Sequence, residues 1–234
     1  MEIYINRLQK ILNDNNVCYS HGIEHSVIVM NNAKKALESE DYNLNDNQKT
    51  AVLLAALLHD ADDRKFFPNN KNFENLISVL EGYDSNFINL VIKMVDLVSS
   101  SKNGDNIPED VAEWMLIPRY SDRLEAIGKI GIKRCYQYGI TTKNPLYTEN
   151  TKRLLDEKDL FELATLERYK NYKGYSDSMI DHYYDKLIRA SFFPIKNYFL
   201  TQEAAKRQRP LIEFLLFFGK KGSITNEDVE EFYN

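Results

Sequence analysis

Helix-breaking residues are scarce in this sequence, which contains nine glycines and six prolines among 234 residues. That is about half the usual share, since the two residues together make up about 12% of average proteins. Few breakers mean few sharp turns, which favours long helices over many short strands. The apolar residues agree with this, because helical spacing is followed by Ile23, Val27, Val29 or Met30, Ala33 and Leu37. The sequence therefore predicts an all-α protein.

The expected helices follow one another along nearly the whole chain. In chain order they cover residues 3–12, 23–37, 46–60, 72–82, 85–100, 109–117, 119–138, 151–170, 177–192, 195–218 and 225–233. The third begins at Asn45–Asn47, whose side chains can cap a helix N-terminus. Polar loops are expected at 99–106 and 139–151, and Gly139–Tyr147 is the one segment that fits a short irregular hairpin.

The length fits one large domain, or one domain with an appended subdomain. We expect a single helical domain over residues 1–234. Residues 1–138 are the denser apolar part and form its core, and residues 139–234 form a helical extension packed on that core. No repeat and no low-complexity linker marks a flexible boundary between the two parts.

Composition excludes several classes of protein. The net charge of −5 disfavours unspecific binding to the nucleic-acid backbone. The longest apolar run, Ala51–Leu58, is far shorter than the roughly 20 residues that cross a bilayer, so no membrane partner is expected. The N-terminus lacks the order of a signal peptide. Cys18 and Cys135 are too few for a disulfide framework, which fits a reducing, cytoplasmic location.

A histidine and three acids directly follow the most apolar segment. Ala51–Leu58 is apolar on all sides, so its helix should lie at the buried centre of a bundle. His59, Asp60, Asp62 and Asp63 come next, and such groups are costly to bury unless something neutralises them. A cation fits there, because a helix C-terminus carries partial negative charge, and imidazole with carboxylate suits divalent transition metals. A polar helix end with solvated acids is the alternative.

Three more residues have the chemistry of ligands but a less informative context. His21 and His25 are four apart, so one helix would place both on the same face, although Gly22 between them can delay the helix start. A helix-start histidine and a surface histidine are the simpler interpretation of this pair. Asp122 lies early in a segment with small residues that allow close packing. An ion pair with a neighbouring arginine is its simpler interpretation.

The order of these residues changes the interpretation. His25, then His59-Asp60, then Asp122 resembles the H…HD…D signature of the HD-domain superfamily of metal-dependent phosphohydrolases. The similarity is closest to the YpgQ/YedJ-like branch and extends over most of the chain. The matching segments are Ser20–His25, Ala55–Phe66, Asp122–Ile132 and His182–Leu187. The resemblance implies an HD-domain helical bundle with a C-terminal helical extension, and a metal held between helices of its core.

Carried over position by position, the resemblance makes His25, His59, Asp60 and Asp122 the ligands of one divalent metal ion. The metals considered are Mn, Mg, Co, Ni, Fe and Zn, and Mn is favoured. No histidine stands between His59 and Asp122, so the extra ligands of dinuclear relatives are missing. His21 falls on the family's other N-terminal histidine and is assigned to catalysis instead of direct metal binding.

Asp63 is the expected general base. In relatives that hydrolyse ppGpp, the acidic residue just after the HD pair takes this role. If the helix continues past Asp60, Asp63 lies on the same face as the ligand pair. A salt bridge to Arg64 or Lys65 is an equally good interpretation of this residue.

Basic side chains should bind the phosphate oxygens of a substrate. The expected ones are Lys65, Arg123, His182 and Lys186. His182, Lys186 and Arg189 follow at i, i+4 and i+7, so one helix face would carry all three. Pairing of this face with Asp181 and Asp185 is the alternative. The resemblance favours a binding role for His182 and Lys186 but not for Arg189.

The sequence thus predicts a metal-dependent phosphohydrolase acting on a small phosphorylated metabolite. A nucleotide is the expected substrate, because the resemblance implies nucleoside triphosphate pyrophosphohydrolysis or phosphatase activity. A non-catalytic module that binds a nucleotide or a partner through the same pocket is the alternative, and the intact ligand set favours the enzyme. The net charge and the lack of a long basic stripe disfavour a nuclease. Assembly into a homo-oligomer stays open.

Overall fold

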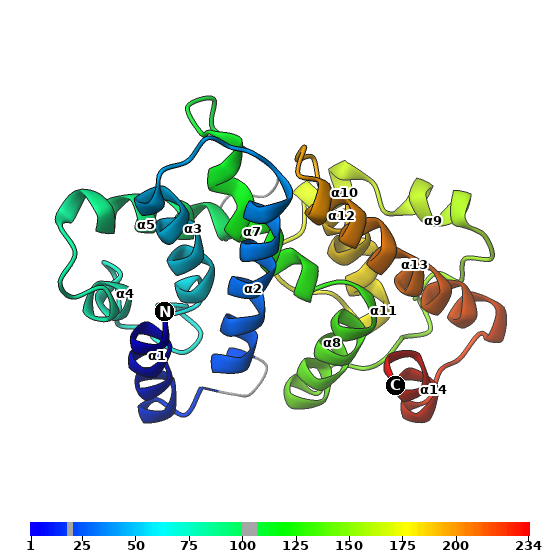
Figure 1. Ribbon diagram of the computed structural model, residues 1–234. Helices are drawn as coiled ribbons and strands as arrows, with labels where there is room; N and C mark the ends of the chain where they lie inside the picture. The colour runs from blue at the N-terminus through cyan, green and yellow to red at the C-terminus, as the bar shows by residue number, and fades with distance from the viewer. Residues whose placement is uncertain (18–20, 100–106) are drawn as a thin grey trace. The chain divides into compact units, whose positions relative to one another are not determined.

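The computed structural model describes residues 1–17, 21–99 and 107–234. Every regular element within these ranges is helical, and no strand occurs in them (Figure 1). The prediction of an all-α protein is therefore confirmed. Cys18, Ser20 and most of the predicted loop at 99–106 lie outside the described residues. None of the described helices has the length and apolar character needed to cross a membrane.

The chain folds into two compact units. Unit 1 comprises Met1–Asp122 and Ile195–Leu200, and unit 2 comprises Arg123–Pro194 and Thr201–Asn234. The first boundary follows Asp122, inside a helix. The expectation of a single domain with its core at residues 1–138 stays a prediction.

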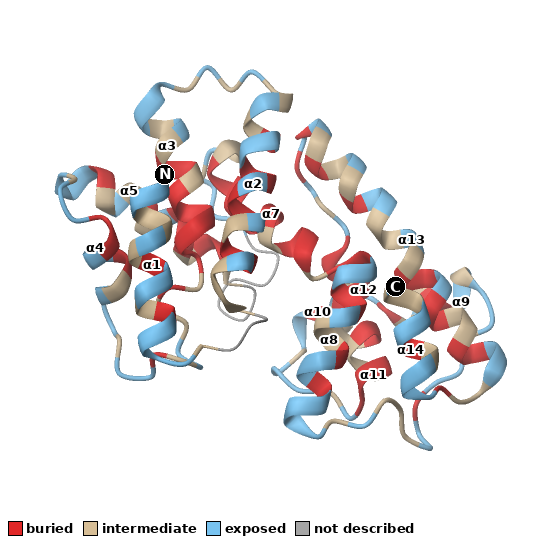
Figure 2. Cartoon of the chain, turned by 60° about the horizontal axis from the view of Figure 1, so that its bottom comes forward, coloured by how far each residue is buried: buried red, intermediate tan, exposed pale blue. Residues whose placement is uncertain are grey.

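Unit 1 is built around one apolar helix. Its elements are α1 (Glu2–Asp14), α2 (Ile23–Ser39), α3 (Asp46–Leu58), α4 (Glu74–Val79), α5 (Ser85–Val98), the 3₁₀ turn η2 (Glu113–Leu116) and most of α7 (Ile117–Glu125). Helix α3 packs against α2 and α5 (Figure 1). The side chains of α3 from Leu54 to Leu58 are fully buried (Figure 2). The predicted position of this apolar helix at the centre of a bundle is confirmed.

Side-chain hydrogen bonds fix the start of α3 and the position of α4, the helix that follows it. Asn45 and Gln48 form a reciprocal capping box at the start of α3. The helix ends at Leu58, slightly earlier than predicted, and a series of turns follows. The carboxylate of Asp62 in these turns accepts hydrogen bonds from the backbone amides of Asn75 and Leu76, both at 3.0 Å. The segment after α3 is thereby fastened to the start of α4.

Unit 2 is also helical throughout its described elements. These are α8 (Gly128–Thr142), α9 (Glu157–Leu163), α10 (Leu166–Lys170), α11 (Met179–His182), the π-helical turn η3 (Tyr183–Leu187), α12 (Ile188–Ala190), most of α13 (Tyr198–Lys221) and α14 (Asn226–Tyr233). Helix α8 packs against α11 and α14. Elements α11, η3 and α12 follow one another without a gap, as the predicted helix at 177–192 requires.

The predicted helix at 119–138 is broken in two. Helix α7 ends at Glu125, and α8 begins at Gly128, whose φ of +75° suits glycine. Gly131 has no room for a side chain, because a Cβ there would lie 2.4 Å from the carbonyl oxygen of Ala126. The glycines of this segment therefore allow a sharp turn between α7 and α8.

Three other predicted elements also differ from the structure. The hairpin at Gly139–Tyr147 is wrong, because residues 139–142 complete α8 and Lys143 ends the helix with a φ of 56°. The helix predicted at 151–170 is two short helices, α9 and α10, which Asp156 and Thr165 cap at their N-termini. Within 109–117, the regular structure is η2 and the first residue of α7. Apolar spacing shows that a segment is helical more reliably than it shows where the helix ends.

Candidate metal centre

Three parts of unit 1 bring four of the predicted residues together. His25 lies in the first turn of α2, His59 and Asp60 follow the last residue of α3, and Asp122 lies in α7. The polar residues that directly follow the buried helix α3 thus lie next to residues of α2 and α7.

The donor atoms of these residues are spaced for one shared cation. The Nε2 atoms of His25 and His59 are 3.2 Å apart. Oδ1 of Asp122 lies 3.3 Å from Nε2 of His25 and 3.4 Å from Nε2 of His59. Oδ2 of Asp60 lies 3.4 Å from Nε2 of His59 and 4.0 Å from Nε2 of His25. Ligand atoms about 2.1 Å from one ion stand about 3.0–3.5 Å apart, so the set suits a divalent metal.

Burial and hydrogen bonding prepare the histidines for this role. The side chains of His25 and His59 are only 5% and 1% exposed, whereas those of Asp60 and Asp122 keep 20% and 28%. Nδ1 of His59 lies 2.9 Å from the carbonyl oxygen of Ala56. Since a carbonyl only accepts, Nδ1 carries a proton, so the neutral form of the imidazole would offer the lone pair of Nε2 to a metal ion. The imidazoles form the floor of the cluster, and the carboxylates lie nearer to solvent.

The electrostatics of the cluster attract positive charge. Burial disfavours the charged form of His59, but the carboxylates of Asp60 and Asp122 outweigh it and hold the imidazole's pKa well above its ordinary value. Burial likewise opposes ionisation of Asp122, yet the neighbouring His59 and His25 hold its pKa well below its ordinary value. The pKa of Asp60 is lowered too, with His59 overcoming the effect of burial. The carboxylates therefore stay ionised, and the cluster draws in a cation or a proton.

His21 lies beside the cluster but outside the helix. Gly22 is the N-cap of α2 and has an extended backbone, and the helix begins at Ile23. His21 therefore lies before α2 and does not share a helix face with His25. Their ring centroids are nevertheless 6.4 Å apart, and the His21 ring lies 5.1 Å from the ring of Phe66. Phe66 is a neighbour that sequence reasoning did not single out.

Asp63 occupies a turn and not a continuing helix. Its backbone amide donates to the carbonyl of Asp60 at 3.1 Å, and its Oδ1 accepts the backbone amide of Lys65 at 2.9 Å. Asp63 was expected to share a helix face with His59 and Asp60 only if the helix continued past Asp60. The helix ends at Leu58, so this condition is not met. Lys65 itself is exposed on the same turn. The roles of Asp63 as base and of Lys65 as phosphate ligand stay predictions.

Asp62 was missed as a residue that shapes the site. Besides the two α4 amides, its Oδ1 accepts the side-chain amide of Asn70 at 2.6 Å. The sequence carries no local signal for these bonds, because the partners lie eight to fourteen residues further along the chain. Asp62 holds the turn in which Asp60 and Asp63 lie.

The remaining predicted residues belong to unit 2. His182 and Lys186 both lie beside Tyr172, whose hydroxyl is 3.2 Å from Nδ1 of His182 and whose ring lies 5.6 Å from the Lys186 ammonium. Arg123 is buried, and its Nη2 lies 3.4 Å from the hydroxyl of Tyr169.

The acids beside His182 and Lys186 are bound by other groups. Asp185 accepts from Nε of Arg168 at 2.7 Å and from the Ser176 hydroxyl at 2.6 Å. Asp181 accepts from the hydroxyls of Thr151 and Ser178, at 2.7 and 2.6 Å. Pairing of the basic helix face with these acids stays an alternative.

Arg189 and the spacing of the basic face differ from the expectation. Cζ of Arg189 lies 5.0 Å from the centroid of the Phe192 ring. The π-helical turn η3 stands between His182 and Arg189, so the i, i+4, i+7 alignment of a regular α-helix does not apply. The three basic residues do not form the single α-helical face that their spacing suggests.

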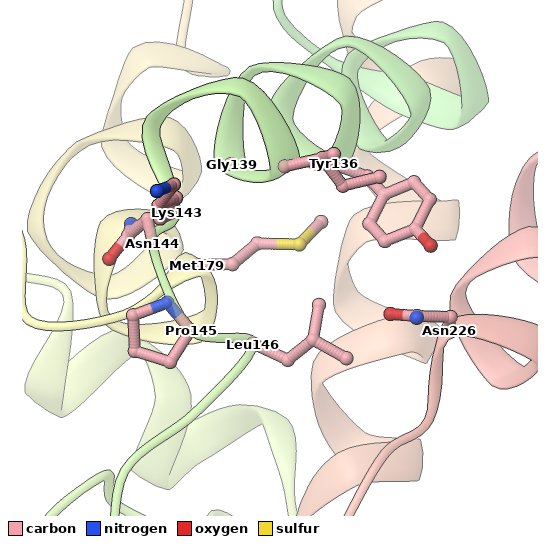
Figure 3. A pocket seen from close by; sticks show the side chains of 9 residues that line it. Tyr136, Gly139, Lys143, Asn144, Pro145, Leu146, Met179 and Asn226 are labelled. Carbon is pink, nitrogen blue, oxygen red and sulfur yellow. The ribbon is translucent and has the colours of Figure 1, made fainter.

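A separate hollow of about 270 Å³ lies in unit 2. Figure 3 shows Tyr136, Leu146 and Met179 facing one another across it, near Asn226 at the start of α14. Within the part of the chain that the structure describes, the residues that line this hollow include none of the predicted site residues. It is therefore distinct from the candidate metal centre.

Comparison with known sequences identifies a relative over nearly the full chain. No family model matches the sequence. The protein named "Uncharacterized protein L803" of Acanthamoeba polyphaga mimivirus is 35% identical over 230 residues. The match covers 90% of this chain and 93% of the viral protein.

Solved structures share the arrangement of helices. A Lactobacillus plantarum protein has a TM-score of 0.68 at 22% identity, covering 94% of this chain and 95% of its own. An HD-superfamily hydrolase from Bacillus thuringiensis has a TM-score of 0.63 at 19% identity, covering 96% and 97%. Bacillus subtilis YpgQ has a TM-score of 0.59 at 17% identity, covering 93% and 92%. At these identities the likeness shows the fold, and it extends over nearly the whole of each chain.

Proposed function

The chain belongs to one family with the mimivirus protein L803 and has the HD-domain fold of YpgQ-like proteins, and from this premise we propose that it is a metal-dependent phosphohydrolase. The observation that carries the proposal is the cluster of His25, His59, Asp60 and Asp122, whose donor atoms converge as the ligands of one ion. Mn²⁺ is the metal we favour.

The roles of the side chains follow from their chemistry. A divalent ion held by the four ligands would polarise a phosphoryl oxygen as a Lewis acid and would make water more acidic. Asp63 accepts the proton of the attacking water as general base. His21, supported by the ring of Phe66, orients the reacting groups.

The substrate we propose is a small phosphorylated metabolite, with a nucleoside triphosphate as its most specific form. The resemblance to YpgQ-like proteins supports the nucleotide. Lys65, Arg123, His182 and Lys186 supply positive charge for phosphate oxygens, since charge-assisted hydrogen bonds to phosphate are stronger than neutral ones.

Metal analysis of an Asp60→Ala variant tests the proposal. Wild-type protein should retain one Mn²⁺ per chain after gel filtration and hydrolyse at least one substrate in a panel of nucleoside triphosphates and phosphomonoesters. Asp60→Ala should lose both, because it removes a ligand of the cluster. Asp110→Ala is the matched control, since Asp110 is a 74% exposed carboxylate of unit 1 that pairs with Lys93.

Two outcomes would contradict the proposal. Stoichiometric metal in Asp60→Ala would remove the ligand assignment. A wild-type protein that binds metal and nucleotide but turns over none of the panel would support the non-catalytic binding module instead.

A further inference from the structure

Tyr172 contacts both predicted phosphate-binding residues of the π-helical segment. Its hydroxyl lies 3.2 Å from Nδ1 of His182, and the two ring centroids are 5.4 Å apart. The ammonium of Lys186 lies 5.6 Å from the centre of the Tyr172 ring, within reach of a cation–π interaction. The Tyr172 side chain thus contacts the His182 imidazole through its hydroxyl and the Lys186 ammonium through its ring.

The phenol is suited to act as a hydrogen-bond donor. Burial, with the charge of Asp185, raises the pKa of Tyr172 to about 12, so its hydroxyl keeps its proton at neutral pH. The Ser176 hydroxyl, which lies 3.5 Å from Nδ1 of His182, already donates to Asp185. With Tyr172 as the donor to Nδ1, the imidazole proton lies on Nε2.

The negative charge of Asp185, which lies beside His182 and Lys186, is neutralised by other groups. Asp185 directly precedes Lys186, but Arg168 and Ser176 bind its carboxylate at 2.7 and 2.6 Å. The negative charge of Asp185 is thus balanced by an arginine from α10.

The backbone at this position is irregular. His182 immediately precedes η3, the π-helical turn that contains Lys186. Such turns are rare in helices and occur frequently at functional sites. This irregularity is independent of the side-chain contacts.

We propose that Tyr172 is a positioning residue, which holds His182 and Lys186 as a paired binding site for the phosphate oxygens of the substrate. The hydroxyl orients the imidazole so that Nε2 donates to an anionic oxygen, and the ring keeps the ammonium beside it. This inference rests on the proposed function, because it refines how that substrate is bound. It assigns a role to a residue that itself touches no reacting atom.

Histidine NMR provides the direct test, since the chain has only four histidines. Long-range ¹H–¹⁵N spectra of the metal-free protein should show His182 with its proton on Nε2. Titration with inorganic pyrophosphate should shift that signal. In Tyr172→Phe, which keeps the ring but loses the hydroxyl, the Nδ1 signal should move and the dissociation constant for pyrophosphate should rise about 3- to 10-fold.

Two further variants separate positioning from folding. Tyr172→Leu also removes the ring and should weaken pyrophosphate binding more than Tyr172→Phe does. Tyr175→Phe is the matched control, because Tyr175 lies on the same segment and is 75% exposed. It should leave the His182 signal, the pyrophosphate affinity and the thermal midpoint as in the wild type. If Tyr172→Leu does not fold, Tyr172→Phe still decides the question.

Kinetics provide a second readout. Tyr172→Phe should raise KM by the same factor as the pyrophosphate dissociation constant, while kcat and metal content stay close to wild type. Wild-type affinity in Tyr172→Phe, an unchanged His182 signal, or no pyrophosphate binding by the wild type would each overturn the inference. Tyr172-dependent binding in a protein without hydrolysis would support the inference while refuting the proposed function.

Discussion

The three acids after α3 have three different settings, although they lie within four positions of one another. Asp60 points at the imidazole of His59, with Oδ2 3.4 Å from Nε2. Asp62 accepts hydrogen bonds from Asn70 and from the start of α4. Asp63 accepts the Lys65 amide within its own turn. The turn thus gives the three carboxylates separate partners, which would leave metal binding to Asp60, anchoring to Asp62 and the proposed proton transfer to Asp63.

Asp63→Asn tests the general base without disturbing the turn. The amide oxygen of asparagine can still accept the Lys65 backbone amide, so only the basicity is lost. Turnover should fall about 10²- to 10⁴-fold, the usual contribution of a positioned base, with metal content unchanged. Asp14→Asn changes an exposed acid of α1 and serves as the control. Steady-state kinetics and metal analysis on the same samples give the answer, and wild-type turnover would remove Asp63 from the mechanism.

At the scale of elements, two helical glycines of unit 2 have opposite surroundings. A Cβ on Gly219, inside α13, would lie 1.7 Å from the backbone carbonyl oxygen of Leu154. The Gly219 carbonyl also accepts two hydrogen bonds from Arg153, at 3.2 and 3.1 Å. Gly139, inside α8, would place its Cβ 3.7 Å from its nearest neighbour, an ordinary contact. Close packing demands glycine at position 219 of α13 but not at position 139 of α8.

Alanine at these two positions should change stability in opposite directions. Gly219→Ala should lower the free energy of unfolding by about 1–3 kcal/mol, because the backbone must move to relieve the overlap. Gly139→Ala should raise it by up to about 1 kcal/mol, since alanine is the better helix former. Urea unfolding of both variants beside the wild type measures the difference. Equal effects of the two substitutions would show that helix propensity alone decides.

At the scale of the whole molecule, the proposed ligands tie distant parts of unit 1 together. His25, His59 and Asp122 come from α2, the end of α3 and α7, and they meet through donor atoms within 3.4 Å of one another. An ion that binds only this folded arrangement stabilises it by mass action. We therefore expect metal binding and the folding of unit 1 to be coupled.

Thermal unfolding should reveal this coupling. At a free Mn²⁺ concentration of 100 times the dissociation constant, stabilisation is about 2.7 kcal/mol, which raises Tm by about 5–10 °C for a chain of this size. Excess EDTA should remove the gain. Asp60→Ala should show no shift with Mn²⁺, because the ligand set is incomplete. A metal-dependent shift of wild-type size in that variant would place the ion elsewhere in the chain.

The sequence by itself determined the features that depend on local spacing. Scarce glycine and proline predict helices, because these residues break regular structure. The apolar run Ala51–Leu58 predicts a buried central helix, because a helix that is apolar on all sides is stable only when it is buried. The order of His25, His59, Asp60 and Asp122 was enough to name the candidate ligands. Their simpler individual interpretations could be set aside only through the resemblance of the whole pattern.

The tertiary structure alone decided which of these groups meet and what supports them. Spacing does not encode that Phe66 lies against His21, or that Tyr172 lies beside both His182 and Lys186. It also does not show that Gly131 faces a carbonyl at the break between α7 and α8. Contacts between residues far apart in the chain arise from packing, and packing depends on the shapes of all the elements together. The ends of helices, the turn after α3 and the neighbours of each charge follow from that packing and not from any local pattern.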